Sequence, residues 1–202
     1  MNSRIRAFTL IELLIVVAII AILAAIAVPN FLEAQTRAKV SRAKADMRSL
    51  ATATEAYQVD WNKYPVPSND LGEQVPLSTA TTEVFETRTS VMLTTPISYI
   101  TTRLNEPFPA QDGEDPQFHF GTRQYLLALE GDDMEWEDYV EELLNGQQSV
   151  IQYLYLSHGP DIDHDTPDVV ENPDGPALYD PTNGTRSSGD VIYWGPGAGF
   201  AN

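Results

Sequence analysis

The chain has 202 residues and no cysteine, so it can neither form a disulfide bond nor use a cysteine side chain as a nucleophile. Its 12 Lys and Arg residues stand against 29 Asp and Glu residues, which gives a formal net charge of −17 at pH 7. A surface of this charge is repelled by nucleic-acid phosphates, so no nucleic-acid partner is expected, and it attracts cations instead.

Residues 8–28 form the first element, an apolar run of 21 residues in which Glu12 is the one charged side chain. At ~1.5 Å per residue, a helix of this length spans the ~30 Å hydrocarbon core of a bilayer. An ionised side chain in that medium needs a partner, and the run itself contains no cation. We therefore expect a transmembrane helix in which Glu12 pairs with a positive charge from elsewhere.

A short polar leader, MNSRIRA, precedes the run and carries Arg4 and Arg6. A cut between Ala7 and Phe8 would create a protonated amino group on Phe8, about 6 Å along the helix axis from the level of Glu12. A neighbouring copy displaced by roughly one helical turn would bring its amine beside this carboxylate, so that the two charges neutralise each other. Glu12 would then set the register between subunits.

Residues 7–14, AFTLIELL, together with Pro29 at the end of the apolar run, resemble the class III leader of type IV prepilins and type II secretion pseudopilins. The resemblance implies cleavage before Phe8 by a prepilin peptidase, N-methylation of Phe8 and assembly into a helical filament at the inner membrane. The family usually has glycine before the cut. Here the residue is Ala7, which is nearly as small, so we expect slower or unaffected processing.

Two other interpretations of the apolar run are open. Ala25-Ile26-Ala27 has the small-x-small form that ordinary signal peptidase recognises, and a cut there would release a soluble protein. The run is longer than the usual ~7 to 15 residues of a signal-peptide core, which argues against this alternative. A plain membrane anchor is the other one, and neither gives Glu12 a role.

Charges on the two sides of the span give opposite indications of its orientation. Arg4 and Arg6 favour a cytoplasmic N-terminus under the positive-inside rule, whereas five cations beyond the span favour the reverse. These five are Arg37, Lys39, Arg42, Lys44 and Arg48. The family resemblance, rather than charge, implies a single-pass inner-membrane protein with a cytoplasmic N-terminus and a periplasmic head.

A helical pattern continues beyond Pro29. Residues of one face recur at spacings of 7, 3, 4, 3 and 4, at Val40, Met47, Leu50, Thr54, Tyr57 and Trp61. This period of about 3.6 predicts one half-buried helix over 8–62, ending before Tyr64-Pro65. Because Pro29 lacks an N–H, we expect a bend or a locally melted turn there, with a plain boundary between two helices as the alternative.

These patterns divide the chain into a leader at 1–7, a transmembrane and polymerisation helix at 8–28, its amphipathic continuation at 29–64, and a head at 65–202. The head holds four Arg against 24 acids, a charge near −20. Strand patterns occur at 118–129, 150–157 and 190–194, with a short helix at 89–93 and a surface helix at 132–145. We expect an α+β fold, in which the long helix packs on a small antiparallel sheet as in type IV pilins.

The C-terminal part of the head contains an Asp-rich segment, SHGPDIDHDTPD, at 157–168. Hard oxygen ligands in a turn-rich loop suit Ca²⁺, which takes about 6 to 8 oxygens. The spacing fails the EF-hand pattern at its sixth and twelfth places. Residues 159–161 and 189–194 instead resemble the two ends of the calcium loop of the major, G-type pseudopilin.

Four aspartates are therefore candidate calcium ligands. The resemblance implies Asp161 and Asp190, and the spacing adds Asp163 and Asp165. An acidic, solvated loop is the alternative interpretation.

Catalytic motifs are lacking in the sequence: there is no HExxH, GxSxG or phosphate-binding glycine loop, and we predict no enzymatic activity. His119, His158 and His164 are the three histidines. His158 and His164 lie among carboxylates where zinc could bind, which leaves a membrane-anchored metallohydrolase as a remote alternative.

We therefore expect a structural subunit: a pseudopilin, most like the major G-type, that polymerises through its N-terminal helix into the pseudopilus of a type II secretion system and supports protein export. Its expected partners are further copies of itself, the prepilin peptidase, minor pseudopilins, the inner-membrane assembly platform and the membrane. A type IV pilin for adhesion, motility or DNA uptake is the first alternative. A membrane-tethered calcium-binding module that does not polymerise is the second.

Overall fold

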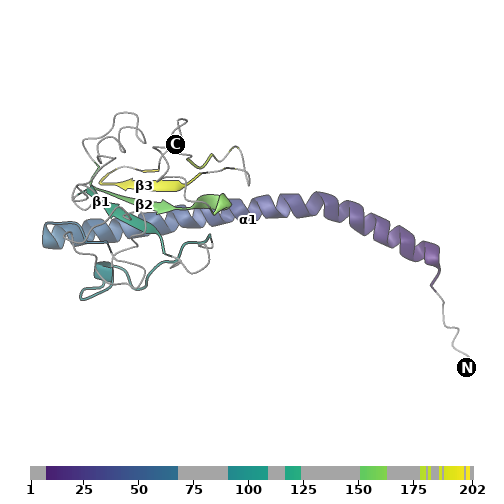
Figure 1. Cartoon of the computed structure of the whole chain (residues 1–202). Coiled ribbons are helices and arrows are strands. Elements are labelled where there is room, and N and C mark those ends of the chain that lie inside the picture. The colour runs from purple at the N-terminus through teal and green to yellow at the C-terminus, as the bar shows by residue number, and fades with distance from the viewer. Residues whose placement is uncertain are drawn as a thin grey trace, which may run out of the picture.

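The computed structural model describes residues 8–67, 91–108, 117–123, 151–162, 178–180, 182, 187, 189–197 and 199–200. Their elements in chain order are the helix α1 (Leu10–Trp61), the 3₁₀ turn η3 (Val91–Leu93), the strands β1 (His119–Thr122) and β2 (Tyr153–Ser157), the 3₁₀ turn η4 (Gly159–Asp161) and the strand β3 (Val191–Gly195). The described elements of the head lie beside the C-terminal part of α1, and the N-terminal part projects far beyond them (Figure 1).

α1 is one continuous helix of 52 residues, close to the predicted range of 8–62. It ends at Asn62, whose left-handed backbone (φ 53°, ψ 30°) lets its N–H donate to the carbonyl of Gln58 at 2.8 Å. Pro29 lies inside the helix, which continues through it and curves gently (Figure 1). The melted turn and the helix boundary considered for Pro29 are therefore wrong, and a shallow bend is what forms.

The two halves of α1 have opposite surroundings. Large apolar side chains in the first half are exposed, and Leu10, Ile22 and Phe31 show 76%, 64% and 62% of their surface. Burial begins at Val40 and recurs along one face of the helix as predicted, although Trp61 remains 47% exposed. The exposed half is the candidate membrane span by length and composition. It needs an apolar surrounding that the single chain does not supply.

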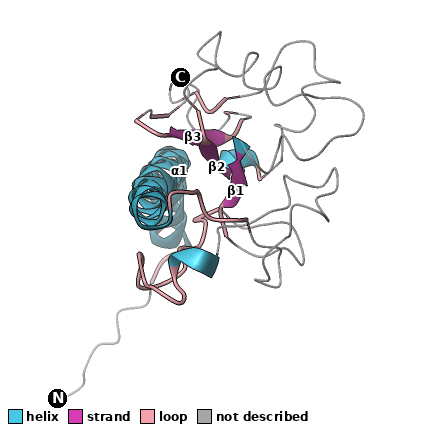
Figure 2. Cartoon of the chain, turned by 90° about the vertical axis from the view of Figure 1, so that its left-hand side faces the viewer, coloured by secondary structure: helices cyan, strands magenta, loops and turns pink. Residues whose placement is uncertain are grey.

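The three strands form one antiparallel sheet in the order β1-β2-β3. Phe120 lies opposite Tyr155, and Tyr155 lies opposite Tyr193, so aromatic residues follow one another across the sheet. Seen along the helix, the sheet forms a second layer beside α1 (Figure 2). Among the described residues, one helix and one sheet therefore bury their apolar faces against each other.

The observed strands fall within or directly beside the predicted ones. β1 begins one residue inside the predicted range 118–129, whose part beyond Arg123 lies outside the described residues. The helix predicted at 89–93 is present as the turn η3, which buries Leu93. The surface helix predicted at 132–145 lies outside the described residues.

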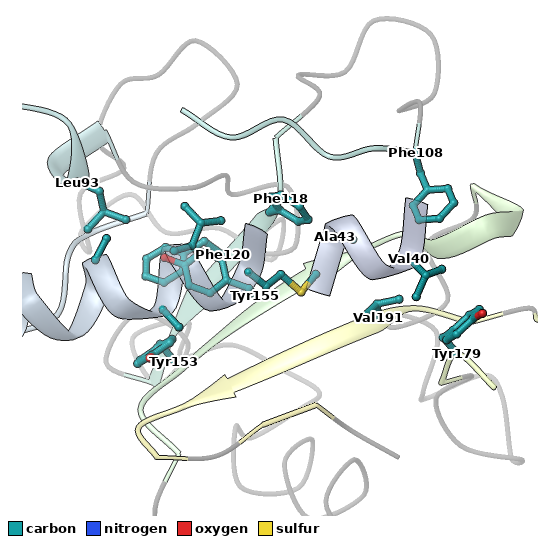
Figure 3. Packing of buried hydrophobic residues seen from close by; sticks show 14 of the residues in the cluster. Val40, Ala43, Leu93, Phe108, Phe118, Phe120, Tyr153, Tyr155, Tyr179 and Val191 are labelled. Carbon is teal, nitrogen blue, oxygen red and sulfur yellow. The ribbon is translucent and has the colours of Figure 1, made fainter. Parts of the chain in front are cut away.

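The core of the head lies between α1 and the sheet, where Phe118, Phe120 and Tyr155 point toward the helix (Figure 3). Phe120 and Tyr155 stack with ring centroids 4.7 Å apart. The Oγ1 of Thr54 on α1 lies 2.7 Å from the hydroxyl oxygen of Tyr155, and both residues are 0% exposed. Burial raises the pKa of the Tyr155 phenol far above its ordinary value, so the hydroxyl stays neutral and joins helix to sheet by a hydrogen bond.

This buried pair can be tested with a double-mutant cycle. Thr54→Val and Tyr155→Phe should each lower the free energy of unfolding by about 1–3 kcal/mol, because each leaves the partner hydroxyl buried without its hydrogen bond. The double variant should lose less than the sum of the two, since neither polar group remains. Chemical denaturation of the full chain in mild detergent measures all four proteins, and strictly additive losses would contradict the assignment.

Candidate functional site

The first candidate site is the start of α1, where Glu12 and Thr9 form a capping box. The Glu12 Oε2 atom accepts hydrogen bonds from the Thr9 backbone N–H at 2.8 Å and from the Thr9 hydroxyl at 2.7 Å. In return, the Glu12 N–H donates to Thr9 Oγ1 at 3.3 Å. The carboxylate therefore has two donors within its own chain before any second copy is present.

Sequence reasoning looked for a cation near Glu12 and missed this local hydrogen-bond donor. The signal was available, because Thr9 stands three residues before Glu12 at the start of an apolar run, which is the capping-box spacing. The structure shows less about the other predicted residues of this site. Phe8 is 71% exposed ahead of the helix, and Ala7 lies outside the described residues. Cleavage and methylation at these positions stay predictions.

The second candidate site is the C-terminal loop, whose two ends meet in the structure. Asp161 is the last residue of η4, and its Oδ2 atom accepts the backbone N–H of Gly189 at 2.9 Å. Gly159 has a φ of +71°, and a Cβ at that position would overlap the carbonyl oxygen of Gly189. Only a residue without a side chain allows the two segments to come this close.

Asp190 follows Gly189 directly and precedes β3. Its side chain is buried at 1% exposure, and its carbonyl oxygen accepts the N–H of Tyr179 at 3.0 Å. The structure therefore brings Asp161 and Asp190 to one junction although 28 residues separate Asp161 from Gly189 in the chain.

The donor chemistry of this junction suits Ca²⁺ in part. Asp161 and Asp190 supply carboxylate oxygens, the ligands that hard divalent cations prefer. Asp163 and Asp165 lie outside the described residues, and within the described part no group of three or more His, Asp or Glu side chains is arranged to hold a metal ion. Two ligand candidates thus come from segments that meet, and calcium binding stays a prediction.

The cations that follow the exposed half of α1 have partners within their own chain. Three of them stand over aromatic rings of the head. The pairs are Lys39 with Phe108, Lys44 with Tyr179 and with Phe200, and Arg48 with Phe200, at 4.9 to 5.7 Å from the ring centroids. Burial, and to a smaller extent the charge of Arg48, lowers the pKa of Lys44. The remaining two, Arg37 and Arg42, form i,i+4 pairs with acids on α1.

Phe200 is the point at which the end of the chain is attached to the helix. Its ring meets that of Tyr193 edge-on at 5.1 Å, and the Trp194 N–H donates to the Gly199 carbonyl at 3.2 Å. The residues after β3 therefore turn back along that strand and rest on Lys44 and Arg48. In a chain without cysteine, these contacts hold the C-terminal segment without a disulfide.

Comparison with known proteins finds matches in the N-terminal part of the chain. Residues 2–28 match the prokaryotic N-terminal methylation motif, and residues 30–87 match the family of type II secretion system protein G. Over these residues the chain is similar to type IV pilins and type II secretion pseudopilins.

Individual relatives come from both branches of the family. The type IV major pilin protein PilA of Myxococcus xanthus is 51% identical over 71 residues, 35% of this chain and 32% of that protein. The type II secretion system core protein G of Pseudomonas aeruginosa is 42% identical over 64 residues, 32% of this chain and 45% of that protein. The type IV wide pilus major component PilA4 of Thermus thermophilus is 51% identical over 59 residues, 29% of this chain and 45% of that protein.

These matches span about a third to a half of the length of the curated relatives. No solved structure matches this chain. The similarity therefore supports the family through the N-terminal helix, while the head must be interpreted from its own residues.

The role of Phe200 can be tested directly. Phe200→Ala should lower the free energy of unfolding by about 1–2 kcal/mol through the loss of two cation–π contacts and the edge-on ring contact. Hydrogen exchange at Trp194 should accelerate, because its acceptor Gly199 is no longer held. Phe200→Leu is the matched control, since it keeps apolar bulk without the ring and should fall between the two. Equal exchange rates in all three proteins would rule out this attachment.

Proposed function

We propose that the chain is a pseudopilin of a type II secretion system, most like its major G-type subunit, and that it assembles into a pseudopilus supporting protein export. The match of residues 30–87 to the protein G family is the observation that carries this proposal. The junction between Asp161 and Gly189 supports it, because it closes the C-terminal loop in a chain that has no disulfide to do so.

Assembly would use the exposed apolar half of α1. In a bilayer these side chains contact lipid, and in a filament the same side chains pack against α1 of other copies. Glu12 would exchange partners in this step. Its carboxylate is held by Thr9 in the single chain, and in the filament it would pair with the Phe8 amine of the adjacent copy, which cleavage after Ala7 has exposed.

The proposed location follows from the same features. The chain would enter the inner membrane once through α1, with the N-terminus in the cytoplasm and the head in the periplasm. Its partners would be other copies of itself, the prepilin peptidase, minor pseudopilins and the assembly platform of the inner membrane. Pro29, inside α1, would lie where the helix leaves the bilayer.

Calcium is part of this proposal. Asp161 and Asp190 would supply ligands from the two ends of the loop, and Asp163 and Asp165 would supply more from within it. Bound Ca²⁺ would neutralise carboxylates in a head with 24 acids against four Arg, and would fix the segment between η4 and β3.

A type IV pilin is the second candidate. The 51% identity to a type IV major pilin over 71 residues favours it. That identity covers about a third of each chain, and the leader and N-terminal helix are common to both branches. The two functions must therefore be distinguished by an experiment in the cell.

Complementation in the native host separates the two functions. A strain lacking the chain should lose type II secreted proteins from its medium while surface pili and motility persist. The wild-type chain should restore secretion, and Glu12→Ala should stay in the membrane but fail to enter sheared filaments, because no carboxylate sets the register. Glu33→Ala is the matched control, since Glu33 lies on the same helix beyond the span and pairs with Arg37.

Loss of pili with normal secretion would replace the pseudopilin by a type IV pilin. Normal filament entry by the Glu12→Ala protein would overturn the register role of Glu12 in either branch.

Calcium binding has its own test on the full chain in detergent. Chelation should lower the melting temperature by several degrees, because a ligand that binds only the folded state stabilises it. Asp161→Asn should remove this response while its amide oxygen still accepts the Gly189 N–H. Asp60→Asn, at the far end of α1, should keep the response. A wild-type melting temperature that chelation leaves unchanged would exclude the site.

A further inference from the structure

A buried polar cluster connects β1 and the end of β2 to Glu106, which lies in the segment before β1. It consists of Glu106, His119, Ser157 and His158, which are 7%, 4%, 0% and 5% exposed. Glu106 Oε1 accepts the Ser157 hydroxyl at 2.5 Å, and Glu106 Oε2 lies 3.2 Å from His158 Nδ1. His158 Nε2 lies 3.2 Å from His119 Nε2. Neither the assembly of α1 nor the calcium loop uses these groups.

The sheet register explains why the two histidines meet. His119 on β1 pairs with Leu156 on β2, and His158 follows two residues later. His158 lies just beyond the end of β2 and has a right-handed helical backbone (φ −57°, ψ −12°). It is a diagonal neighbour of His119, a distance within reach of long side chains. Their rings cross at 81° with centroids 4.7 Å apart.

The hydrogen bonds determine where protons can be. An ionised Glu106 only accepts, so His158 Nδ1 must carry a hydrogen. In the neutral pair, His158 Nε2 is then an acceptor and receives the N–H of His119 Nε2. When the pair gains one proton, His158 Nε2 becomes a donor and His119 Nε2 accepts, and the positive charge lies beside the Glu106 carboxylate. Both states satisfy the 3.2 Å contact.

A second proton cannot be accommodated. Both Nε2 atoms would then carry hydrogens directed into the same 3.2 Å contact, and two positive charges would face each other in a buried site. We propose that His119 and His158 share one proton at neutral pH and that a second proton at acidic pH breaks their contact, which makes this cluster a pH-sensitive junction of the head.

Charged groups lie on the described elements around the pair. Glu106, from the segment before β1, contacts His158 directly. Lys39 of α1 stands over Phe108, two residues beyond Glu106. Asp161 ends η4 and is held by Gly189, and Asp190 precedes β3, whose Val191 pairs with Ser157.

The pH effect follows from the geometry of this contact. One hydrogen fits between the two Nε2 atoms at 3.2 Å, and two do not. The contact is therefore kept while the pair carries at most one extra proton, and it is lost when a second proton is added at acidic pH.

Melting of the full chain in detergent tests the proposal. The wild-type melting temperature should fall by several degrees between about pH 7 and about pH 5.5, a range around the ordinary histidine pKa in which most carboxylates stay ionised. His119→Gln should remove most of this fall, because an amide can donate to or accept from His158 in either protonation state. His164→Gln, which changes the third histidine, is the matched control and should keep the wild-type profile.

Nitrogen NMR of the histidine rings supplies a readout that a purely structural role would not change. The pair should titrate in two separated steps, with His158 Nδ1 protonated throughout. One shared step near the ordinary pKa, or a His119→Gln profile equal to the wild type, would overturn the proposal. Added Zn²⁺ at neutral pH is a further arm: a rise in melting temperature that His119→Gln abolishes would mean a metal site instead of a shared proton.

Discussion

The fold depends on the burial of one face of α1, from Val40 to Tyr57, under a three-stranded sheet. Within the described residues, the aromatic rings of β1 and β2 reach the core through contact with this helix, and the hydrogen bond between Thr54 and Tyr155 crosses the same boundary. The head therefore requires the C-terminal half of α1 as one of its two layers. Because the apolar first half belongs to the same continuous helix, a folded head is attached to an apolar segment whose exposure to water is unfavourable.

The positions of the charged side chains follow from that arrangement. The sequence concentrates cations on α1 and acids in the head. Lys39, Lys44 and Arg48 lie over rings of their own head, so their charge is retained while their stems cover apolar surface. With four Arg against 24 acids, the head has a large negative net charge, and a divalent cation or a change of pH can act on it.

The sequence was sufficient where the signal is periodic or local. The apolar run and the spacing from Val40 to Tyr57 predict α1 almost to the residue, and alternation around Tyr153 and Tyr155 predicts the central strand. The bend expected at Pro29 is present, but the melted turn and the helix boundary are not, because the remaining hydrogen bonds on both sides keep the helix intact. The contacts of Glu106 with His158 and of Lys44 with Phe200 join residues far apart in the chain, and no spacing in the sequence indicates them.

The continuity of α1 also has a mechanical consequence. At ~1.5 Å per residue the helix is about 78 Å long, and a tensile load applied between head and membrane would pass through its hydrogen bonds in series. The turn at Pro29 has one bond fewer than its neighbours, because proline cannot donate to the carbonyl of Ala25. Under tension this turn would yield before any other, so extension would begin at the membrane exit while the head kept its shape.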